Sequence, residues 1–197
     1  MEAMLTVSTS IVEQRAYHHG DLRAALVSAG LQALESTDIS EISLRGLARE
    51  VGVSATAVYR HFPDKRALLT AMAMEGLARL GQLQQRAAED AGDQAFSATG
   101  RAYVRFALAN PGLFRLVFTH CDMRSDSLPE GNLAADMLLG RAAKVTGGDK
   151  AAARRFALQA WALVHGLAML MLDGQLPADE ALIDQVIDGP SMWPQRL

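Results

Sequence analysis

Polar and basic side chains between Ser43 and Lys65 are of the types that bind phosphate groups. They gather at three predicted helix starts: Ser43 with Arg45, then Ser54, then Lys65. A helix start suits a phosphate because its free amide groups and the positive end of its dipole point outward. This spacing predicts a surface that binds the backbone of a nucleic acid.

Two short helices joined by a tight turn must position these side chains. Behind Ser43, apolar residues recur at helical spacing: Leu44, Leu47, Ala48 and Val51. Gly52 ends that helix, because a left-handed turn is easiest for glycine. Ser54 caps a second helix that ends near Arg60–His61, before Pro63. The pattern predicts a helix-turn-helix, whose second helix enters the major groove of DNA.

The segments GLAREVGVS (46–54) and VYRHFPDKRALL (58–69) resemble the amino-terminal domain of TetR-type transcriptional regulators, over residues 15 to 76. Two later segments, YVRFALANPGLFRLVF (103–118) and WALVHGLAML (161–170), resemble a regulatory-domain subtype with a Trp-x-x-x-His-Gly motif. The resemblance implies that three amino-terminal helices bind DNA and that the remaining helices form a ligand pocket. It also implies that the last two helices pair two subunits.

The resemblance implies a role for each DNA-binding candidate. Residues implied to touch the DNA backbone or the groove edge are Arg45, Tyr59, His61 and Lys65. Residues implied to approach bases are Ser54, Ala55 and Thr56. Two candidates have another interpretation, since Tyr59 could be a core aromatic and His61 a stacked surface histidine. Because Tyr59 follows Val58, the two side chains point to different faces, which favours DNA contact by Tyr59.

The third helix departs from the usual family pattern. It carries Ala55, Thr56 and Ala57 where a basic residue, a glycine and a threonine are common. Such small side chains provide little readout of base edges. Specificity then depends on Arg45, on DNA shape, or on an amino-terminal arm. The arm residues suited to this are Arg15, Tyr17, His18 and His19.

Composition and charge fit this organisation. The chain has 197 residues, of which 50% are hydrophobic, and it is rich in alanine and leucine. We therefore expect an all-α fold of about nine helices.

The expected parts are a disordered arm (1–16), a helix-turn-helix domain (17–63) and an effector-binding and dimerisation domain (64–197). The net charge is −3, yet residues 43–66 hold five basic and two acidic residues, a local excess suited to DNA.

The larger domain could be a sensor or a plain scaffold. Aromatic, methionine and histidine side chains there could line a pocket for an apolar effector: Phe106, Phe114, Phe118, Trp161, His165 and Met169. The alternative is an ordinary helical core with His165 hydrogen-bonded inside it. We expect no cofactor and no metal, because His120, Cys121 and Asp122 are adjacent and cannot converge on one ion.

The helices predicted near 149–173 and 178–188 indicate a homodimer. They are apolar on more than one face and contain many small residues, so they need burial that one chain does not provide. The longest apolar run, from Trp161 to Leu172, is too short to span a bilayer. With no signal segment evident, we expect a cytoplasmic protein without membrane contacts.

These observations predict a DNA-binding transcriptional regulator, a ligand-responsive repressor that acts as a homodimer on a palindromic operator. The long helix starting near Asp64 would carry an effector-induced shift to the DNA-binding helices. The alternative is an all-helical small-molecule-binding protein or enzyme whose helix-turn-helix serves protein contacts. We expect no enzyme, because the chain has no phosphate-binding glycine loop, no metal-spaced His/Cys set and no nucleophile elbow.

Overall fold

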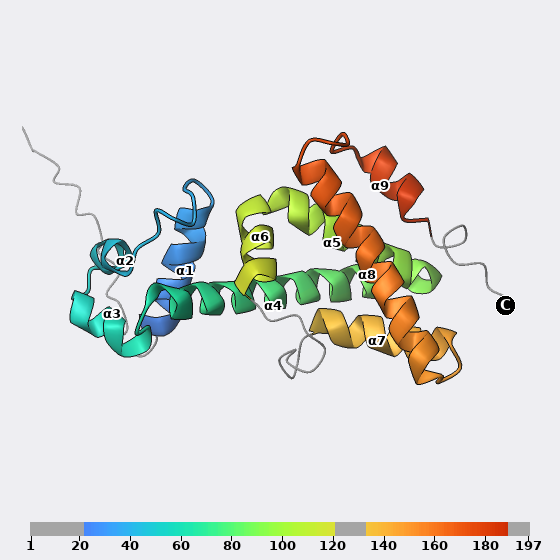
Figure 1. Ribbon diagram of the computed structural model, residues 1–197, viewed down its shortest axis with the longest axis horizontal. Helices are drawn as coiled ribbons and strands as arrows, with labels where there is room; N and C mark the ends of the chain where they lie inside the picture. Colours follow the sequence, from blue (N-terminus) through green and yellow to red (C-terminus); the bar gives the residue numbers. More distant parts are fainter. Residues whose placement is uncertain (1–21, 121–132, 189–197) are drawn as a thin grey trace, which may run out of the picture.

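The computed structural model describes residues 22–120 and 133–188, and these residues form helices and turns without a strand. A head is built from α1 (Leu22–Leu34), α2 (Leu44–Val51) and α3 (Ala55–His61), at one end of the long helix α4 (Lys65–Ala91) (Figure 1). The body contains α5 (Ala95–Ala109), α6 (Pro111–His120), α7 (Leu133–Val145), α8 (Lys150–Leu172) and α9 (Glu180–Val186). The expected all-α fold with about nine helices is confirmed over the described ranges.

Side-chain caps set the helix boundaries in the head. Ser43 Oγ accepts a hydrogen bond from the amide of Gly46, and Ser54 Oγ accepts one from the amide of Ala57. Each cap satisfies an amide that the first helical turn would otherwise leave unpaired. Gly52 ends α2 with a φ of 76°, a left-handed conformation that favours glycine. These caps confirm the predicted helix-turn-helix boundaries.

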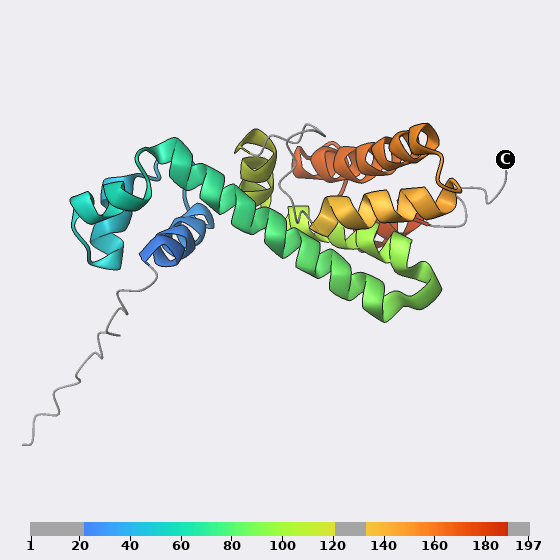
Figure 2. The ribbon, with the colours of Figure 1, turned by 90° about the horizontal axis from the view of Figure 1, so that it is seen from below.

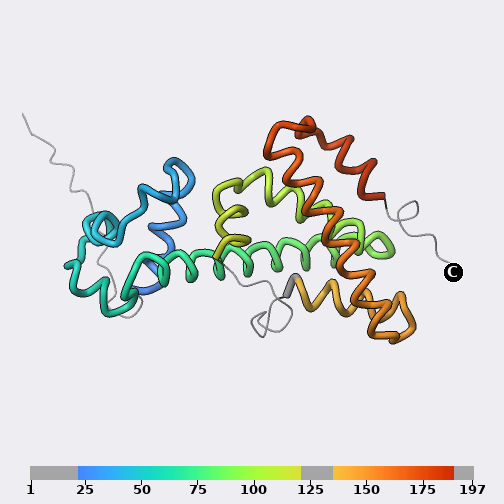
Figure 3. The backbone as a smooth tube through the Cα atoms, in the orientation of Figure 1, coloured from blue at the N-terminus to red at the C-terminus, as the bar shows by residue number. Residues whose placement is uncertain are grey.

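Helix α4 joins the head to the body (Figure 3). Its first turns pack against α1, and its later turns pack against α5, α6 and α7. A single hydrophobic cluster runs from Leu26 in the head, through Met72 on α4, to Phe114 in the body, and all three are fully buried. The two parts therefore share one core along α4.

The close approach of α6 to α4 depends on Gly76. A Cβ atom at this position would lie 2.6 Å from Cδ1 of Leu113 and 2.9 Å from Cγ2 of Val117. A larger residue at this position would therefore force the Leu113 or Val117 side chain to shift. Helix α6 thereby crosses α4 beside the head, and its Gly112 lies against Leu34 of α1.

In the body, α5 lies between α4 and α8, and α7 runs beside α8 (Figure 2). Helix α8 is long and apolar enough to cross a membrane by length and composition alone, since an 18-residue window within it has a mean hydropathy of 1.4. Its most apolar window is 33% buried against the rest of the protein, and core helices of soluble proteins meet the same criterion. This packing explains only part of the apolar character of α8, because one face of the helix is not covered by the other helices.

Candidate functional site

The head exposes most of the side chains predicted to contact DNA. Ser43 and Arg45 at the start of α2 are exposed, as are Ser54 and Thr56 at the start of α3, whereas Ala55 is half-buried. Ser43 and Ser54 use their oxygens as acceptors within their own helices. Their hydroxyl protons remain free to be donated to a phosphate oxygen.

Two neighbouring residues of α3 point in opposite directions, as the sequence predicts. Val58 is fully buried, whereas 44% of Tyr59 is exposed, so Tyr59 is not a core aromatic. His61 at the end of α3 is also exposed. The next residue, Phe62, is buried beneath the guanidinium of Arg23, which lies 5.3 Å from the ring centroid. Tyr59 and His61 are therefore accessible to a partner molecule.

Lys65 has a structural partner that the sequence does not reveal. Its Nζ donates a hydrogen bond to the carbonyl of Ser40, at 2.8 Å, and its side chain is half-buried. Ser40 also donates to Oδ1 of Asp38, and this hydrogen bonding lowers the pKa of Asp38, with a further contribution from the charge of Lys65. Lys65 thus ties the start of α4 to the loop between α1 and α2. The arm residues Arg15, Tyr17, His18 and His19 lie outside the described residues.

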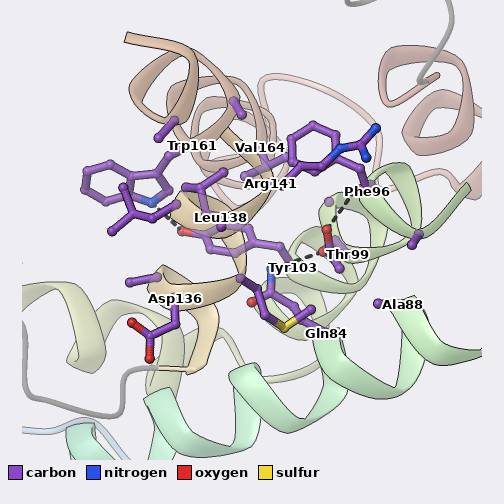
Figure 4. A pocket seen from close by; sticks show the side chains of 18 of the residues that line it. Gln84, Ala88, Phe96, Thr99, Tyr103, Asp136, Leu138, Arg141, Trp161 and Val164 are labelled. Atoms are coloured by element: carbon purple, nitrogen blue, oxygen red, sulfur yellow. Dashed lines mark hydrogen bonds between the residues drawn. The ribbon is translucent and has the colours of Figure 1, made fainter. Parts of the chain in front are cut away.

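The body contains a cavity of about 1020 Å³, open to solvent on one side and lined mainly by α4, α5, α7 and α8 (Figure 4). Its wall includes Leu77, Leu80 and Gln84 of α4, and Tyr103 of α5. A volume of this size is in the range of, or slightly above, typical small-molecule sites. The cavity can enclose an organic ligand.

The structure divides the predicted pocket residues between the cavity wall and the core. Phe118 and Trp161 line the cavity, but Phe106, Phe114, His165 and Met169 do not. Phe106 and Phe114 are buried in the hydrophobic core, because their sides of α5 and α6 face other helices. The rings nevertheless form one cluster, in which the Phe118 centroid lies 4.8 Å from Phe114 and 4.7 Å from His165.

A hydrogen-bonded triad links the cavity wall to this cluster. The Tyr103 hydroxyl lies 2.9 Å from Nδ1 of His165, and Nε1 of Trp161 donates to the same hydroxyl at 3.3 Å. Burial raises the pKa of Tyr103 well above its usual range and lowers the pKa of His165. His165 therefore has a hydrogen-bonded structural role, which corresponds to the alternative interpretation of this residue.

Sequence reasoning did not identify Tyr103 and Gln84 as wall residues. A signal is present, because Leu77, Leu80 and Gln84 follow helical spacing along one stripe of α4, with a polar residue inside an apolar series.

The described residues contain no group of three or more His, Cys, Asp or Glu able to hold a metal ion. Cys121 lies outside the described residues.

Comparison with protein-family models gives two matches. Residues 26–72 match the model described as bacterial regulatory proteins, tetR family. Residues 96–189 match the model described as tetracyclin repressor-like, C-terminal domain. The first match covers the helix-turn-helix, and the second covers most of the cavity wall.

Individual relatives agree with these matches. The chain is 35% identical to a protein of unknown function from Rhodococcus sp. RHA1, whose solved structure superposes with a TM-score of 0.72 over 91% of this chain and 96% of that chain. It is 24% identical to the uncharacterised HTH-type transcriptional regulator YobS of Bacillus subtilis, over 82% of this chain and 84% of YobS. It is 40% identical to the class D tetracycline repressor protein of Escherichia coli over 57 residues, 29% of this chain and 26% of the repressor.

Proposed function

Because this chain belongs to the TetR family of bacterial transcriptional regulators, we propose that it is a ligand-responsive repressor that binds a palindromic operator as a homodimer. It is a DNA-binding regulator with a carboxy-terminal ligand-binding domain, and nothing in its matches indicates an enzyme. We place it in the cytoplasm, where its DNA target lies.

One observation supports ligand responsiveness above all others: a single helix forms part of both sites. Helix α4 begins at Lys65 in the head and supplies Leu77, Leu80 and Gln84 to the cavity wall. Since a helix moves as a nearly rigid rod, a ligand that displaces this wall also displaces the head. A ligand can shift the equilibrium only to the extent that it binds the two positions of α4 with different affinity.

Helix α6 provides a second connection between the cavity and the head. Its Phe118 lines the cavity, its Leu113 packs against α4 at Gly76, and its Gly112 lies against Leu34 of α1. A ligand in contact with Phe118 therefore acts on the same junction. The agreement of these two routes supports coupling between the cavity and the DNA-binding surface.

The homodimer proposal rests on the uncovered face of α8. One stripe of this helix contains the exposed residues Gln159, Ala162 and Leu170, with Gly166 between them. Small residues allow another helix to approach closely, and 46% of Leu170 is exposed. Pairing two copies through this face would bury the stripe and would present two heads to half-sites about 34–36 Å apart.

The DNA part of the proposal is tested by selecting operators from a random duplex library and then measuring affinity against salt concentration by fluorescence anisotropy. We expect an enriched palindrome and a steep fall in affinity as salt increases, because phosphate contacts release counterions. A flat salt dependence with no enriched sequence would favour the alternative in which the helix-turn-helix contacts a protein.

Ligand responsiveness needs a second measurement on the selected operator. Compounds that raise the melting temperature are identified in a thermal-shift screen of small apolar molecules, and operator affinity is then measured with each at saturation. We expect the affinity to fall. An unchanged operator affinity with a bound compound in the cavity would contradict the coupling along α4.

A further inference from the structure

We propose that the cavity selects a ligand whose enclosed part is neutral and apolar and carries one hydroxyl or N–H group that donates a hydrogen bond to Oε1 of Gln84. The proposal rests on the function assigned above, in which the cavity receives the effector, and it specifies the chemistry of that effector. It follows from the hydrogen bonds already made inside the cavity.

The orientation of the Gln84 amide is fixed by α5. Nε2 of Gln84 donates to the backbone carbonyl of Thr99 at 3.2 Å. Because a carbonyl can only accept, the amide nitrogen must lie on the side of Thr99 and the amide oxygen on the other side. Figure 4 shows Gln84 below Tyr103, among the side chains that line the cavity.

Oε1 of Gln84 is a buried acceptor without a protein donor. Among the described residues it is the buried side-chain oxygen or nitrogen that has no hydrogen-bond partner. A buried amide oxygen without a partner is unfavourable, and most such groups in proteins are paired. The atom is covered in the ligand-free protein, so a ligand donor reaches it only after a neighbouring side chain of the wall moves aside. A ligand that supplies a donor there gains a hydrogen bond that an otherwise similar ligand cannot make.

Two hydroxyl groups of the wall are already engaged, which favours ligand donors over ligand acceptors beside them. The Tyr103 hydroxyl is shared with Trp161 and His165. Thr99 Oγ1 donates to the carbonyl of Phe96 at 2.7 Å. A ligand acceptor that approached Tyr103 or Thr99 would therefore compete with one of these bonds, whereas a ligand donor that approached Gln84 would not.

The charged side chains that line the cavity lie where its wall is exposed to solvent. The charged lining residues are all exposed: Asp93, Asp136, Arg141, Lys144 and Arg154. Both signs occur, so they do not favour a single ionic ligand. The remaining polar side chains are neutral, and an unpaired charge enclosed among them would be costly. The enclosed part of the ligand is therefore uncharged, and the aromatic rings of Phe118 and Trp161 favour a flat apolar body.

Three probes of nearly equal size separate these requirements: naphthalene, 2-naphthol and 2-methoxynaphthalene. The hydroxyl of 2-naphthol can donate, whereas the methoxy oxygen can only accept. Using the full-length protein and isothermal titration calorimetry, we expect 2-naphthol to bind about tenfold more tightly than either of the other two, the effect of one buried hydrogen bond.

The variant Gln84→Met removes the acceptor while keeping a side chain of similar length. We expect the preference for 2-naphthol to disappear and the affinity for naphthalene to stay within about twofold. The matched control is Gln85→Met, which changes an exposed glutamine that bonds Glu89 on the outside of α4. This control should retain the preference.

Equal affinities for 2-naphthol and 2-methoxynaphthalene, or no binding of any probe, would overturn the inference. So would a preference that persists in Gln84→Met. If Gln84→Met does not fold, the comparison of 2-naphthol with 2-methoxynaphthalene on the wild-type protein still tests the inference. Operator affinity is measured in parallel: 2-naphthol bound through Gln84 without any change in operator affinity would contradict the proposed function and leave this inference intact.

Discussion

The hydroxyl of Tyr103 lies 2.9 Å from Nδ1 of His165. The indole N–H of Trp161 can only donate, so it uses one lone pair of the Tyr103 oxygen. In the tautomer that carries the His165 proton on Nε2, the Tyr103 hydroxyl donates to Nδ1. Burial lowers the pKa of His165 and so favours its neutral form in the folded protein.

The first prediction is that protonation of His165 destabilises the protein at acidic pH. Burial lowers the pKa of His165 below 6.5, its ordinary value, so the unfolded chain binds a proton before the folded protein does. The stabilising contribution is complete above pH 6.5 and is lost as the pH falls below that value. We expect the melting temperature of the wild type to fall more steeply between pH 7.5 and 5.5 than that of His165→Gln. Parallel curves would contradict this prediction.

The second prediction separates DNA contacts from structural contacts in the head. Arg45 is exposed, so Arg45→Ala should weaken binding to all duplex sequences and reduce the salt dependence without changing the melting temperature. Lys65→Met should lower the melting temperature as well, because the variant loses the bond to the Ser40 carbonyl, worth about 0.5–1.5 kcal/mol or somewhat more for a charged donor.

Anisotropy titrations on specific and random duplexes, together with thermal melts, give both readouts for these head variants. Tyr59→Ala is a useful companion, since Tyr59 is exposed and should behave like Arg45→Ala. A loss confined to the selected operator would show instead that Arg45 or Tyr59 reads bases. An unchanged melting temperature in Lys65→Met would show that the Ser40 bond contributes little in solution.

The third prediction concerns the crossing of α4 and α6. A Cβ atom in Gly76→Ala would lie 2.6 Å from Leu113 Cδ1, so the Leu113 and Val117 side chains, or the two helices, must shift, at a cost of about 1–3 kcal/mol. The matched control is Gly140→Ala in α7, where the added Cβ meets no described atom within 4 Å beyond its own chain neighbours and helix backbone. There, alanine should stabilise the helix by about 0.5–1 kcal/mol. Chemical denaturation measures both, and equal effects would disprove the close approach.

The fourth prediction tests the homodimer through α8. Leu170→Glu places a charge on the exposed stripe of α8 and should yield a monomer, as measured by light scattering after size exclusion. The matched control is Leu83→Glu on α4, where the leucine is 42% exposed against 46% for Leu170. The control should retain the mass of a dimer. A dimer in both variants would place the interface elsewhere.

Local signals in the sequence are sufficient to predict the helix boundaries of the head. Ser43, Gly52 and Ser54 act through hydrogen bonds and a φ angle that involve neighbouring residues, so their types alone predict the ends of α2 and α3. The burial of Val58 beside exposed Tyr59 also follows from helical geometry. The partner of Lys65 could not be predicted in this way, because the Ser40 carbonyl is 25 residues away in the chain and any backbone carbonyl can accept.

The residues of the cavity wall cannot be predicted from single helices alone. Periodicity identifies the buried side of α5 and α6, but it does not distinguish a side that faces another helix from a side that faces a cavity. For this reason the prediction included Phe106 and Phe114, which pack in the core, together with Phe118 and Trp161, which line the wall. Only the arrangement of α4 against α5 reveals that Gln84 lacks a donor.

The contact at Gly76 divides α4 into two arms of a lever. With a rise of about 1.5 Å per residue, the arm toward Lys65 is about 16 Å long and the arm toward Ala91 about 22 Å. If α6 acts as the pivot, a movement of about 2 Å at the cavity end swings the head by about 1.5 Å in the opposite direction. In a two-fold pair the two displacements add to about 3 Å, close to the axial rise of one base pair. The distance between the two heads then no longer matches the distance between successive major grooves.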